Sequence, residues 1–300
     1  MTSSTAPLVS IVIPTYNHAH FLTEAIHSLL KQTCTTWEVI IVNNFSTDDT
    51  ERVVAGFNDE RIRLINFANS GVIAASRNAG IRLATAEYVA FLDSDDFWEP
   101  QKLEICLSVL KQQKLDWVCH GERWFGDGID KKVIYGPLSR ASFEALLYKG
   151  NCISTSAVVV RRSFLVALGG FNESPEFVTS EDYELWLRLA QSGAKLNFIN
   201  EILGAYRIHA GGQSRGAIRN MLATSAVVER FFTAQPKPTR YEKWRRRVRR
   251  GGIFYGGARA LQNTHNHMDA WPWFLKALVS WPFDKRLGPA MVMNALGLRF

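Results

Sequence analysis

The stretch Glu87-Tyr-Val-Ala-Phe-Leu-Asp-Ser-Asp-Asp96 joins an apolar run to an abrupt acidic end. Residues 87–92 predict a buried strand, and ligands bind at the carboxyl ends of strands in open α/β sheets. Because side chains alternate along a strand, the carboxylates of Asp93 and Asp95 are expected on one side. Paired carboxylates suit a hard divalent cation that in turn holds phosphates. A solvated turn with a helix N-cap is the alternative interpretation of the same acids.

The residues before this stretch alternate apolar runs with amphipathic segments. In chain order, further strands and helices are predicted at 8–13, 21–30, 38–42, 46 onward, 61–65 and 71–84. Ser46 and Asp49 are expected to open the second of these helices as a capping box. The alternation predicts a parallel sheet with right-handed crossovers and helices on both faces. Polar loops at the strand ends should then converge on one ligand cleft.

The pattern becomes looser after residue 111. Strands are predicted at 117–120, 132–135 and 156–160, and an amphipathic helix is predicted at 181–190. This half mixes helices and strands and is expected to continue the same sheet.

The composition excludes several classes of protein. Of the 300 residues 47% are hydrophobic and 21% are charged, which is ordinary for a soluble protein. The four cysteines are scattered, so a disulfide framework and a structural zinc site are not expected. The start of the chain lacks a signal-peptide pattern, and no apolar run reaches the roughly 20 residues that span a bilayer. A cytoplasmic location is therefore expected.

The net charge of +7 is concentrated near the end of the chain. Residues 236–300 hold thirteen Lys or Arg against three Asp or Glu, a net +10, which leaves −3 for the remainder. Six basic residues lie within 243–250, where a solvated helix face is the default interpretation. No recognised nucleic-acid module accompanies them, so nucleic acid is not an expected partner. Together with Trp271, Trp273 and Trp281, they favour peripheral attachment to the anionic inner face of the plasma membrane.

Seven strings in order resemble the family 2 glycosyltransferases. They begin at Val9-Ser-Ile-Val-Ile-Pro-Thr-Tyr-Asn17, and the others cover 38–50, 75–80, 91–96, 169–171, 181–187 and 206–209. The resemblance implies an α/β fold of the GT-A type, with a mixed, mainly parallel sheet flanked by helices. It places the catalytic domain at 1–215, with a nucleotide-sugar half of about 1–100 and an acceptor half of about 101–215. Residues 216–300 would form a basic, Trp-rich helical extension.

The resemblance also implies a set of donor-binding residues. They are Pro14, Thr15, Tyr16, Asn17, Asn43, Asn44, Ser46, Arg77, Asn78, Ser94 and His209. Thr15 and its neighbours would line the nucleoside pocket, Arg77 would face the pyrophosphate, and His209 would close on the phosphates or the metal. Asn43 and Asn44 replace an acidic pair that the family normally has. An amide still offers an acceptor to uracil, so a UDP-sugar is favoured, but the base stays open.

The same resemblance assigns the chemistry. Asp93 and Asp95 would hold Mn²⁺ or Mg²⁺, and Asp182 would be the catalytic base, with Glu181 as the alternative. A cytoplasmic inverting enzyme would then transfer a sugar to a saccharide or lipid-linked saccharide, in surface polysaccharide or glycolipid synthesis. A nucleotide-sugar-binding protein without catalysis and a nucleotidyltransferase are the alternatives. The second would need a Gly-rich, Lys-containing phosphate loop, and the segment 14–17 is not one.

Overall fold

The computed structural model describes residues 6–209, 216–235 and 237–298. The chain divides into two compact units, each of which is built from separate segments. The first unit comprises residues 1–146, 151–173 and 184–210. The second comprises residues 147–150, 174–183 and 211–300.

The first unit is built on one mixed sheet, to which nine strands contribute in the described part of the chain. The strands are β1 (Val9–Thr15), β2 (Trp37–Asn43), β3 (Ile62–Asn66), β4 (Tyr88–Phe91), β5 (Phe97–Trp98), β6 (Trp117–Gly126), β7 (Ile129–Val133), β8 (Val158–Arg161) and β9 (Leu196–Arg207). Their order is β3-β2-β1-β4-β8-β6-β9-β5, and β7 pairs with β6. The sheet confirms the predicted α/β class.

The pairing directions bring several strand ends to one edge. Strands β3, β2, β1 and β4 are mutually parallel. Strand β8 is antiparallel to both β4 and β6, and β6 is parallel to β9. Strands β6 and β9 therefore run in the direction of β4, and all of them end at the edge where the acids after β4 lie. This is the edge at which ligands bind in open α/β sheets.

Helices cover both faces of this sheet. The helices that lie within the first unit are α1 (Ala19–Leu30), α2 (Thr50–Ala55), α3 (Ile73–Leu83), α4 (Lys102–Gln112) and α6 (Arg162–Ala167), while α5 (Phe143–Lys149) and α7 (Glu181–Gln191) have residues in both units. Leucines and isoleucines of α1 and α4 join alternate residues of β1 and β2 in one buried cluster. Helix α3 packs on the other face, where a Cβ at Gly80 would lie 2.3 Å from Val12 Cγ1. Glycine at position 80 therefore allows the close approach of α3 to β1.

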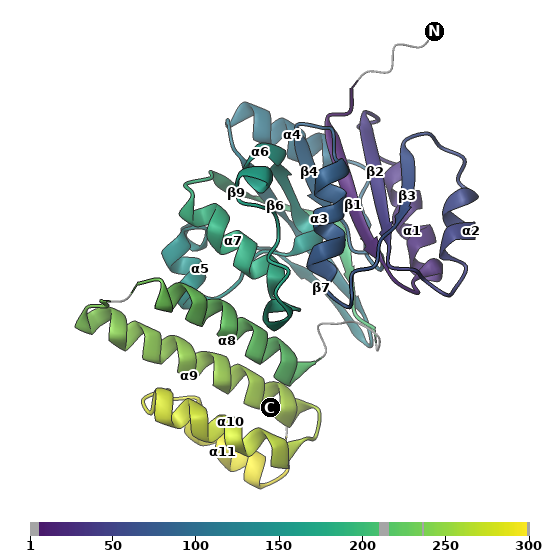
Figure 1. Ribbon diagram of the computed structural model, residues 1–300. Helices are drawn as coiled ribbons and strands as arrows, with labels where there is room; N and C mark the ends of the chain where they lie inside the picture. Colours follow the sequence, from purple (N-terminus) through teal and green to yellow (C-terminus); the bar gives the residue numbers. More distant parts are fainter. Residues whose placement is uncertain (1–5, 210–215, 236, 299–300) are drawn as a thin grey trace. The chain divides into compact units, whose positions relative to one another are not determined.

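The second unit contains four long helices in its described residues, α8 (Ala217–Thr233), α9 (Arg240–Asn263), α10 (His267–Ser280) and α11 (Leu287–Ala295). Helix α9 begins with a capping box in which Thr239 and Glu242 exchange hydrogen bonds. Small and apolar residues of α9, α10 and α11 form one buried cluster. Figure 1 shows these helices lying side by side. The expected helical extension is therefore present.

The basic run at 243–250 does not form the free, solvated face that its charge suggested. Arg246 is buried and donates to Phe232 O at 2.8 Å. Arg250 forms an ion pair with Glu229 at 2.5 Å. Several of the charges thus hold the second unit together.

The tryptophans of the second unit also take part in its packing. Trp273 stacks on Phe254 of α9, with ring centroids 6.0 Å apart. Trp281 meets Trp244 edge-to-face at 5.9 Å. Within the described ranges, no helix combines the length and the apolar character that crossing a membrane requires.

Candidate active site

The first acid after β4 has a cationic partner from a distant part of the first unit. Asp93 Oδ1 accepts a hydrogen bond from Arg77 Nη2 at 2.7 Å, and the Arg77 side chain is only 4% exposed. The Arg77 guanidinium also lies 5.4 Å from the centre of the Phe171 ring. Helix α3 thus carries a buried cation to the end of β4.

Asp95 pairs with His209, which follows the end of β9. His209 Nε2 lies 2.8 Å from Asp95 Oδ2, and each side chain is 19% exposed. The His209 ring packs on Phe21 of α1, with centroids 4.8 Å apart. The structure therefore brings together Arg77, Asp93, Asp95 and His209. The strand pattern had paired the two acids, and the family resemblance had added Arg77 and His209.

Arg207 fixes the end of β9 against the acids; it lies within the string 206–209, but the sequence assigned it no role. Its Nε donates to Asp95 O at 2.9 Å, and its guanidinium also donates to Glu24 of α1. The guanidinium lies 5.0 Å from the Phe21 ring centre and 4.5 Å from that of Phe125. Arg207 is thus held by hydrogen bonds and by two cation–π contacts.

His18 is a second residue of this cluster that the sequence did not single out. Its Nδ1 lies 2.9 Å from Ser94 Oγ, and its ring centroid is 5.8 Å from that of His209. Burial lowers the pKa of His18, and the nearby carboxylate of Asp95 partly opposes that shift. His18 immediately follows the polar loop 15–17 and precedes α1, and this position is the only signal that could have pointed to it.

Two polar loops are joined beside this cluster. Asn17 adopts a positive φ of 53°, and its Oδ1 accepts a hydrogen bond from Thr47 N at 2.8 Å. Asn17 N donates to Ser46 Oγ at 2.9 Å. The loop after β1 is therefore tied to the loop after β2, as the convergence of the strand ends predicted.

The predicted capping box at Ser46 is wrong. Helix α2 has Asp49 as its N-cap residue, without a side-chain cap hydrogen bond. Ser46 Oγ instead donates to Asn43 Oδ1 at 2.6 Å, because the loop bends back on β2 before α2 begins.

The two asparagines at the end of β2 differ in how far their amides are available to a ligand. Asn43 is fully buried, its Oδ1 accepts from Ser46, and its Nδ2 donates to Asn66 Oδ1 at 2.8 Å. Both ends of the Asn43 amide are thus used inside the protein. Asn44 is partly exposed, and its Oδ1 accepts from Asn69 N at 3.0 Å.

The loop after β1 offers further groups beside Asn44. Thr15 is 4% exposed, and its Oγ1 has no hydrogen-bond partner among the described residues. Pro14 is buried beside it, and the Tyr16 side chain is 53% exposed. A buried hydroxyl next to an exposed ring is a suitable lining for a nucleoside pocket.

Asn78 has a structural task in this arrangement. Its Nδ2 donates to Phe171 O and its Oδ1 accepts from Phe171 N, both at 2.8 Å. Gly170 has a φ of +73°, and a Cβ there would lie 2.3 Å from Asn78 Oδ1. The amide of Asn78 therefore anchors the loop at 169–171 to α3.

Two further acids, Asp96 and Glu122, are buried near the partly exposed pair of Asp93 and Asp95. Asp96 is buried and accepts hydrogen bonds from Ser156 Oγ at 2.6 Å and from Arg207 N at 2.9 Å. Burial, followed by the charges of Asp95 and Glu122, raises the pKa of Asp96 well above its usual range. Asp96 thus ties the acidic strand end to the Ser156 hydroxyl and to the backbone at the end of β9.

Glu122 is the deeper of these buried acids. It accepts a hydrogen bond from Tyr135 Oη at 2.6 Å, and burial raises its pKa from 4.5 to about 7. Because the folded state holds this proton more tightly than the unfolded chain does, Glu122 costs no stability below about pH 4.5. Stability is then lost as the pH rises from about 4.5 to about 7.

We expect Glu122→Gln to remove this pH dependence. Relative to the variant, the wild type should lose about 1.4 kcal/mol of unfolding free energy per pH unit within that window. Urea denaturation at pH 5, 6 and 7 measures the difference. The control Tyr135→Phe keeps the acid but removes a hydrogen bond that favours its charged form, so the slope should persist and extend to higher pH. Parallel pH profiles for the wild type and Glu122→Gln would contradict the expectation.

The hydrogen bonds of Asp93 and Asp95 show which of their carboxylate oxygens could ligate a cation. Among the described residues, Asp93 Oδ2 and Asp95 Oδ1 accept no hydrogen bond, so each carboxylate keeps one oxygen for a ligand. No group of three or more His, Cys, Asp or Glu side chains in these residues could hold a metal ion by itself. The donor set therefore fits a hard cation that a phosphate helps to ligate, rather than one enclosed by protein.

Asp182 and Glu181 belong to the second unit, in the first turn of α7. Asp182 Oδ1 accepts from Tyr183 N at 2.6 Å, and Asp182 is partly exposed. Glu181 is 5% exposed, and its Oε2 accepts from Thr179 N at 2.7 Å. Asp182 is thus the more accessible of the two acids.

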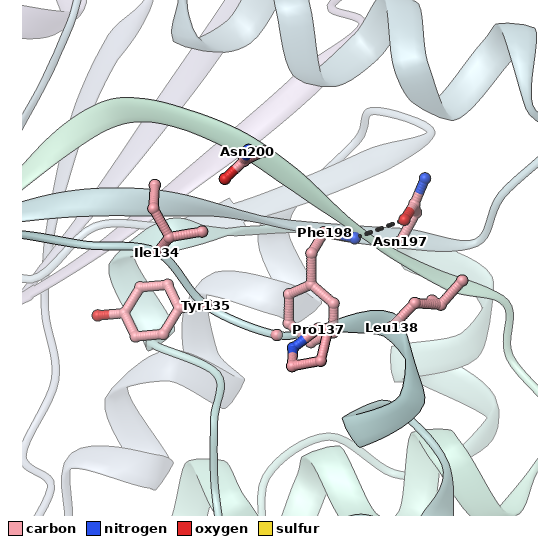
Figure 2. Close-up of a pocket in the computed structure, with 8 residues that line it drawn as sticks. Ile134, Tyr135, Pro137, Leu138, Asn197, Phe198 and Asn200 are labelled. Carbon is pink, nitrogen blue, oxygen red and sulfur yellow. Dashed lines mark hydrogen bonds between the residues drawn. The ribbon is translucent and has the colours of Figure 1, made fainter.

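A separate pocket of about 460 Å³ lies in the first unit, between the segment after β7 and strand β9 (Figure 2). Tyr135 and Phe198 contribute rings to it, and Asn197 and Asn200 contribute amides. Asn200 lies where the register of β9 shifts against β6, in a bulge that redirects its side chain. None of the residues expected to bind the donor lines this pocket.

The fold and the acidic strand end together define a protein of the GT-A glycosyltransferase class. A model described as "Glycosyl transferase family 2" matches residues 10–165 of the chain. The chain belongs to this family, and it is a glycosyltransferase.

Curated relatives match about two thirds of the chain or more. The chain is 33% identical over 207 residues to the putative teichuronic acid biosynthesis glycosyltransferase TuaG of Bacillus subtilis, covering 67% of this chain and 79% of TuaG. It is 31% identical over 222 residues to WfaP of Escherichia coli, covering 74% of this chain and 86% of WfaP. WfaP is named as a UDP-Glc:α-D-GlcNAc-diphosphoundecaprenol β-1,3-glucosyltransferase.

Solved structures share the fold at low sequence identity. The mannosyltransferase PcManGT of Pyrobaculum calidifontis, in complex with GDP-Man and Mn²⁺, aligns with a TM-score of 0.61 and 18% identity, over 98% of this chain and 85% of that one. TarS of S. aureus in complex with UDP-GlcNAc gives 0.60 and 17%, over 97% and 92%. These likenesses confirm the GT-A fold that the sequence predicted.

Proposed function

We propose that this glycosyltransferase moves a sugar from a nucleotide-diphospho-sugar, with a UDP-sugar favoured, to a hydroxyl of a saccharide or lipid-linked saccharide. The cluster of Asp93, Asp95, Arg77 and His209 at the carboxyl edge of the sheet carries the proposal. The name of WfaP specifies a UDP-sugar and a lipid-linked acceptor, and the TarS structure holds UDP-GlcNAc. TuaG is named for the synthesis of a surface polysaccharide, which supports the same kind of process here.

The donor would lie along the polar loops at this edge. Thr15, Tyr16 and Asn44 would face the nucleoside, since the Asn43 amide is already used by Ser46 and Asn66. The Arg77 guanidinium would turn toward the diphosphate, for which a planar fork of donors is well suited. His18 and His209 would approach the same phosphates from the other side of Asp95.

Asp93 and Asp95 would hold Mn²⁺ or Mg²⁺ through the carboxylate oxygens that accept no protein hydrogen bond. When bound, the cation would neutralise negative charge on the departing nucleoside diphosphate. PcManGT was solved with Mn²⁺ together with a nucleotide sugar, which supports a divalent cation of this kind.

Asp182 would act as the general base. A sugar hydroxyl is a weak nucleophile, so a positioned carboxylate must accept its proton as attack proceeds. The acceptor oxygen would bond to the anomeric carbon as the bond to the diphosphate oxygen breaks, and the proton would move to Asp182. Attack opposite to the leaving group would invert the anomeric configuration.

A panel of nucleotide sugars tests this proposal. UDP-, GDP-, dTDP- and CMP-sugars are compared by thermal shift, with and without Mn²⁺, and donor hydrolysis is then followed for those that bind. One donor should raise the melting temperature in a Mn²⁺-dependent way and should be hydrolysed slowly. Binding without any turnover would favour a non-catalytic binding protein, and the absence of binding to any donor would refute the proposal.

The enzyme would act at the inner face of the plasma membrane. The net charge of +10 on residues 236–300 supports attraction to anionic lipid, and a lipid-linked acceptor would be found there.

A further inference from the structure

Helices α10 and α11 each expose apolar side chains that are not buried in the core of the second unit. Met268, Leu275, Val279 and Phe283 are 81%, 51%, 77% and 75% exposed. The first three recur at spacings of seven and four residues, so they lie along one side of α10. Val292 and Leu296, at α11, are 60% and 66% exposed.

The inner side of the same helices is already packed. Ala270, Phe274 and Ala277 of α10 are buried together with Ala258 of α9 and Leu287 of α11. The outward residues are therefore not part of this core. A surface helix ordinarily turns polar residues outward, so a helix that is apolar on both sides needs a second apolar environment.

The charges beside this face are mainly basic. Lys276 and Lys285 are exposed, and so are Lys243 and Arg247 of α9. Asp269 is an exposed acid in the same region, and Asp284 is paired with Arg286 at 2.7 Å. A second copy of the chain would bring another segment of net charge +10 against this one, whereas anionic lipid would neutralise it.

We propose that the outward face of α10 and α11 inserts into the headgroup region of an anionic bilayer. Val279, Phe283 and Val292 enter the apolar boundary, while Lys276 and Lys285 contact lipid phosphates. This insertion rests on the proposed function at the membrane. It replaces attraction by the basic run alone with apolar insertion as the main means of attachment. Arg246 and Arg250 are committed to contacts inside the second unit, so apolar insertion supplies what the basic run alone does not.

Flotation with vesicles tests the proposal on the full chain. Vesicles of phosphatidylcholine with 30% phosphatidylglycerol are compared with pure phosphatidylcholine, at low salt and in 0.5 M NaCl. The wild type should float with the anionic vesicles and should partly remain bound in high salt. The double variant Val279→Ser/Phe283→Ser should bind at least about tenfold more weakly at low salt and not at all in high salt. The matched control Val166→Ser, at a residue 58% exposed in the first unit, should bind as the wild type does.

A second variant reports insertion directly. Brominated lipid should quench the tryptophan fluorescence of Phe283→Trp more strongly than that of Val166→Trp. Unchanged flotation of the double variant, or equal quenching at the two positions, would overturn the proposal. A lipid-independent dimer that the double variant abolishes would instead show an interface between copies of the chain. Donor hydrolysis is measured on the same preparations, so loss of membrane binding with hydrolysis retained separates this proposal from the proposed function.

Discussion

Replacing Asp182 by Asn is expected to lower kcat for sugar transfer by about 10²- to 10⁴-fold, the usual contribution of a general base. The amide keeps the size of the side chain and the acceptor for Tyr183 N, but it cannot take a proton from the acceptor hydroxyl. The donor should still bind, because the residues proposed to hold it lie elsewhere. Initial rates of transfer and calorimetric titration with the nucleotide sugar measure the two quantities separately.

Two neighbouring acids provide controls for this variant. Glu181→Gln should change kcat much less, since Glu181 is buried and hydrogen-bonded to Thr179 N. Glu176→Gln, at an exposed acid of the second unit, should leave transfer unchanged. A larger loss in Glu181→Gln than in Asp182→Asn would assign the base to Glu181. Donor affinity lost in parallel with kcat would show that Asp182 holds the donor.

Replacing Asp95 by Asn is expected to remove most of the Mn²⁺-dependent part of donor binding. One oxygen remains, but it is neutral and is a weaker ligand for a hard cation. Substituting a residue that only supports a metal ligand typically lowers metal affinity or activity by roughly 10- to 100-fold. Because Asp95 is proposed to be a ligand itself, its substitution should lower donor affinity in the presence of Mn²⁺ by more than that. Titration of the nucleotide diphosphate over a series of Mn²⁺ concentrations measures it.

The informative comparison for Asp95 is another acid of the same unit. Asp49→Asn makes the same chemical change at a side chain that is 63% exposed and paired with Arg52. It should leave both affinities at wild-type values. If Asp95→Asn weakened donor binding equally with and without Mn²⁺, the role of Asp95 would be to position His209, and the metal assignment would be abandoned.

The parts of this fold that follow a local pattern could be predicted from the sequence. β1, β2 and β4 are continuous apolar runs with polar ends, and their parallel pairing follows from the helices between them. That pairing alone brings Asp93 to the edge where Thr15 and Asn43 end their strands. Strand β9 escaped prediction, because its register shifts against β6 break the alternation of side chains on which strand prediction depends.

The remainder of the site depends on pairs that are distant in sequence. Arg207 and Asp95 are 112 positions apart, and His18 and Ser94 are 76 apart. No periodicity connects such pairs, and a lone His or Arg is ordinarily a surface residue. For Asn43, the sequence suggested a role that the contacts do not favour. An asparagine at this position suggested recognition of the base, but only the three-dimensional structure shows that its amide is hydrogen-bonded to Ser46 and Asn66.

The attachment of β9 to the acidic edge sets a lower limit on any functional fragment. The match to the family model ends at residue 165, before Arg207 and His209. A fragment cut at that point would keep the Asp93 side chain and the loops after β1 and β2. It would lose the backbone bond from Arg207 that holds Asp96 and the imidazole beside Asp95. We therefore expect that a fragment must extend at least to residue 209 to bind a nucleotide sugar at the proposed site.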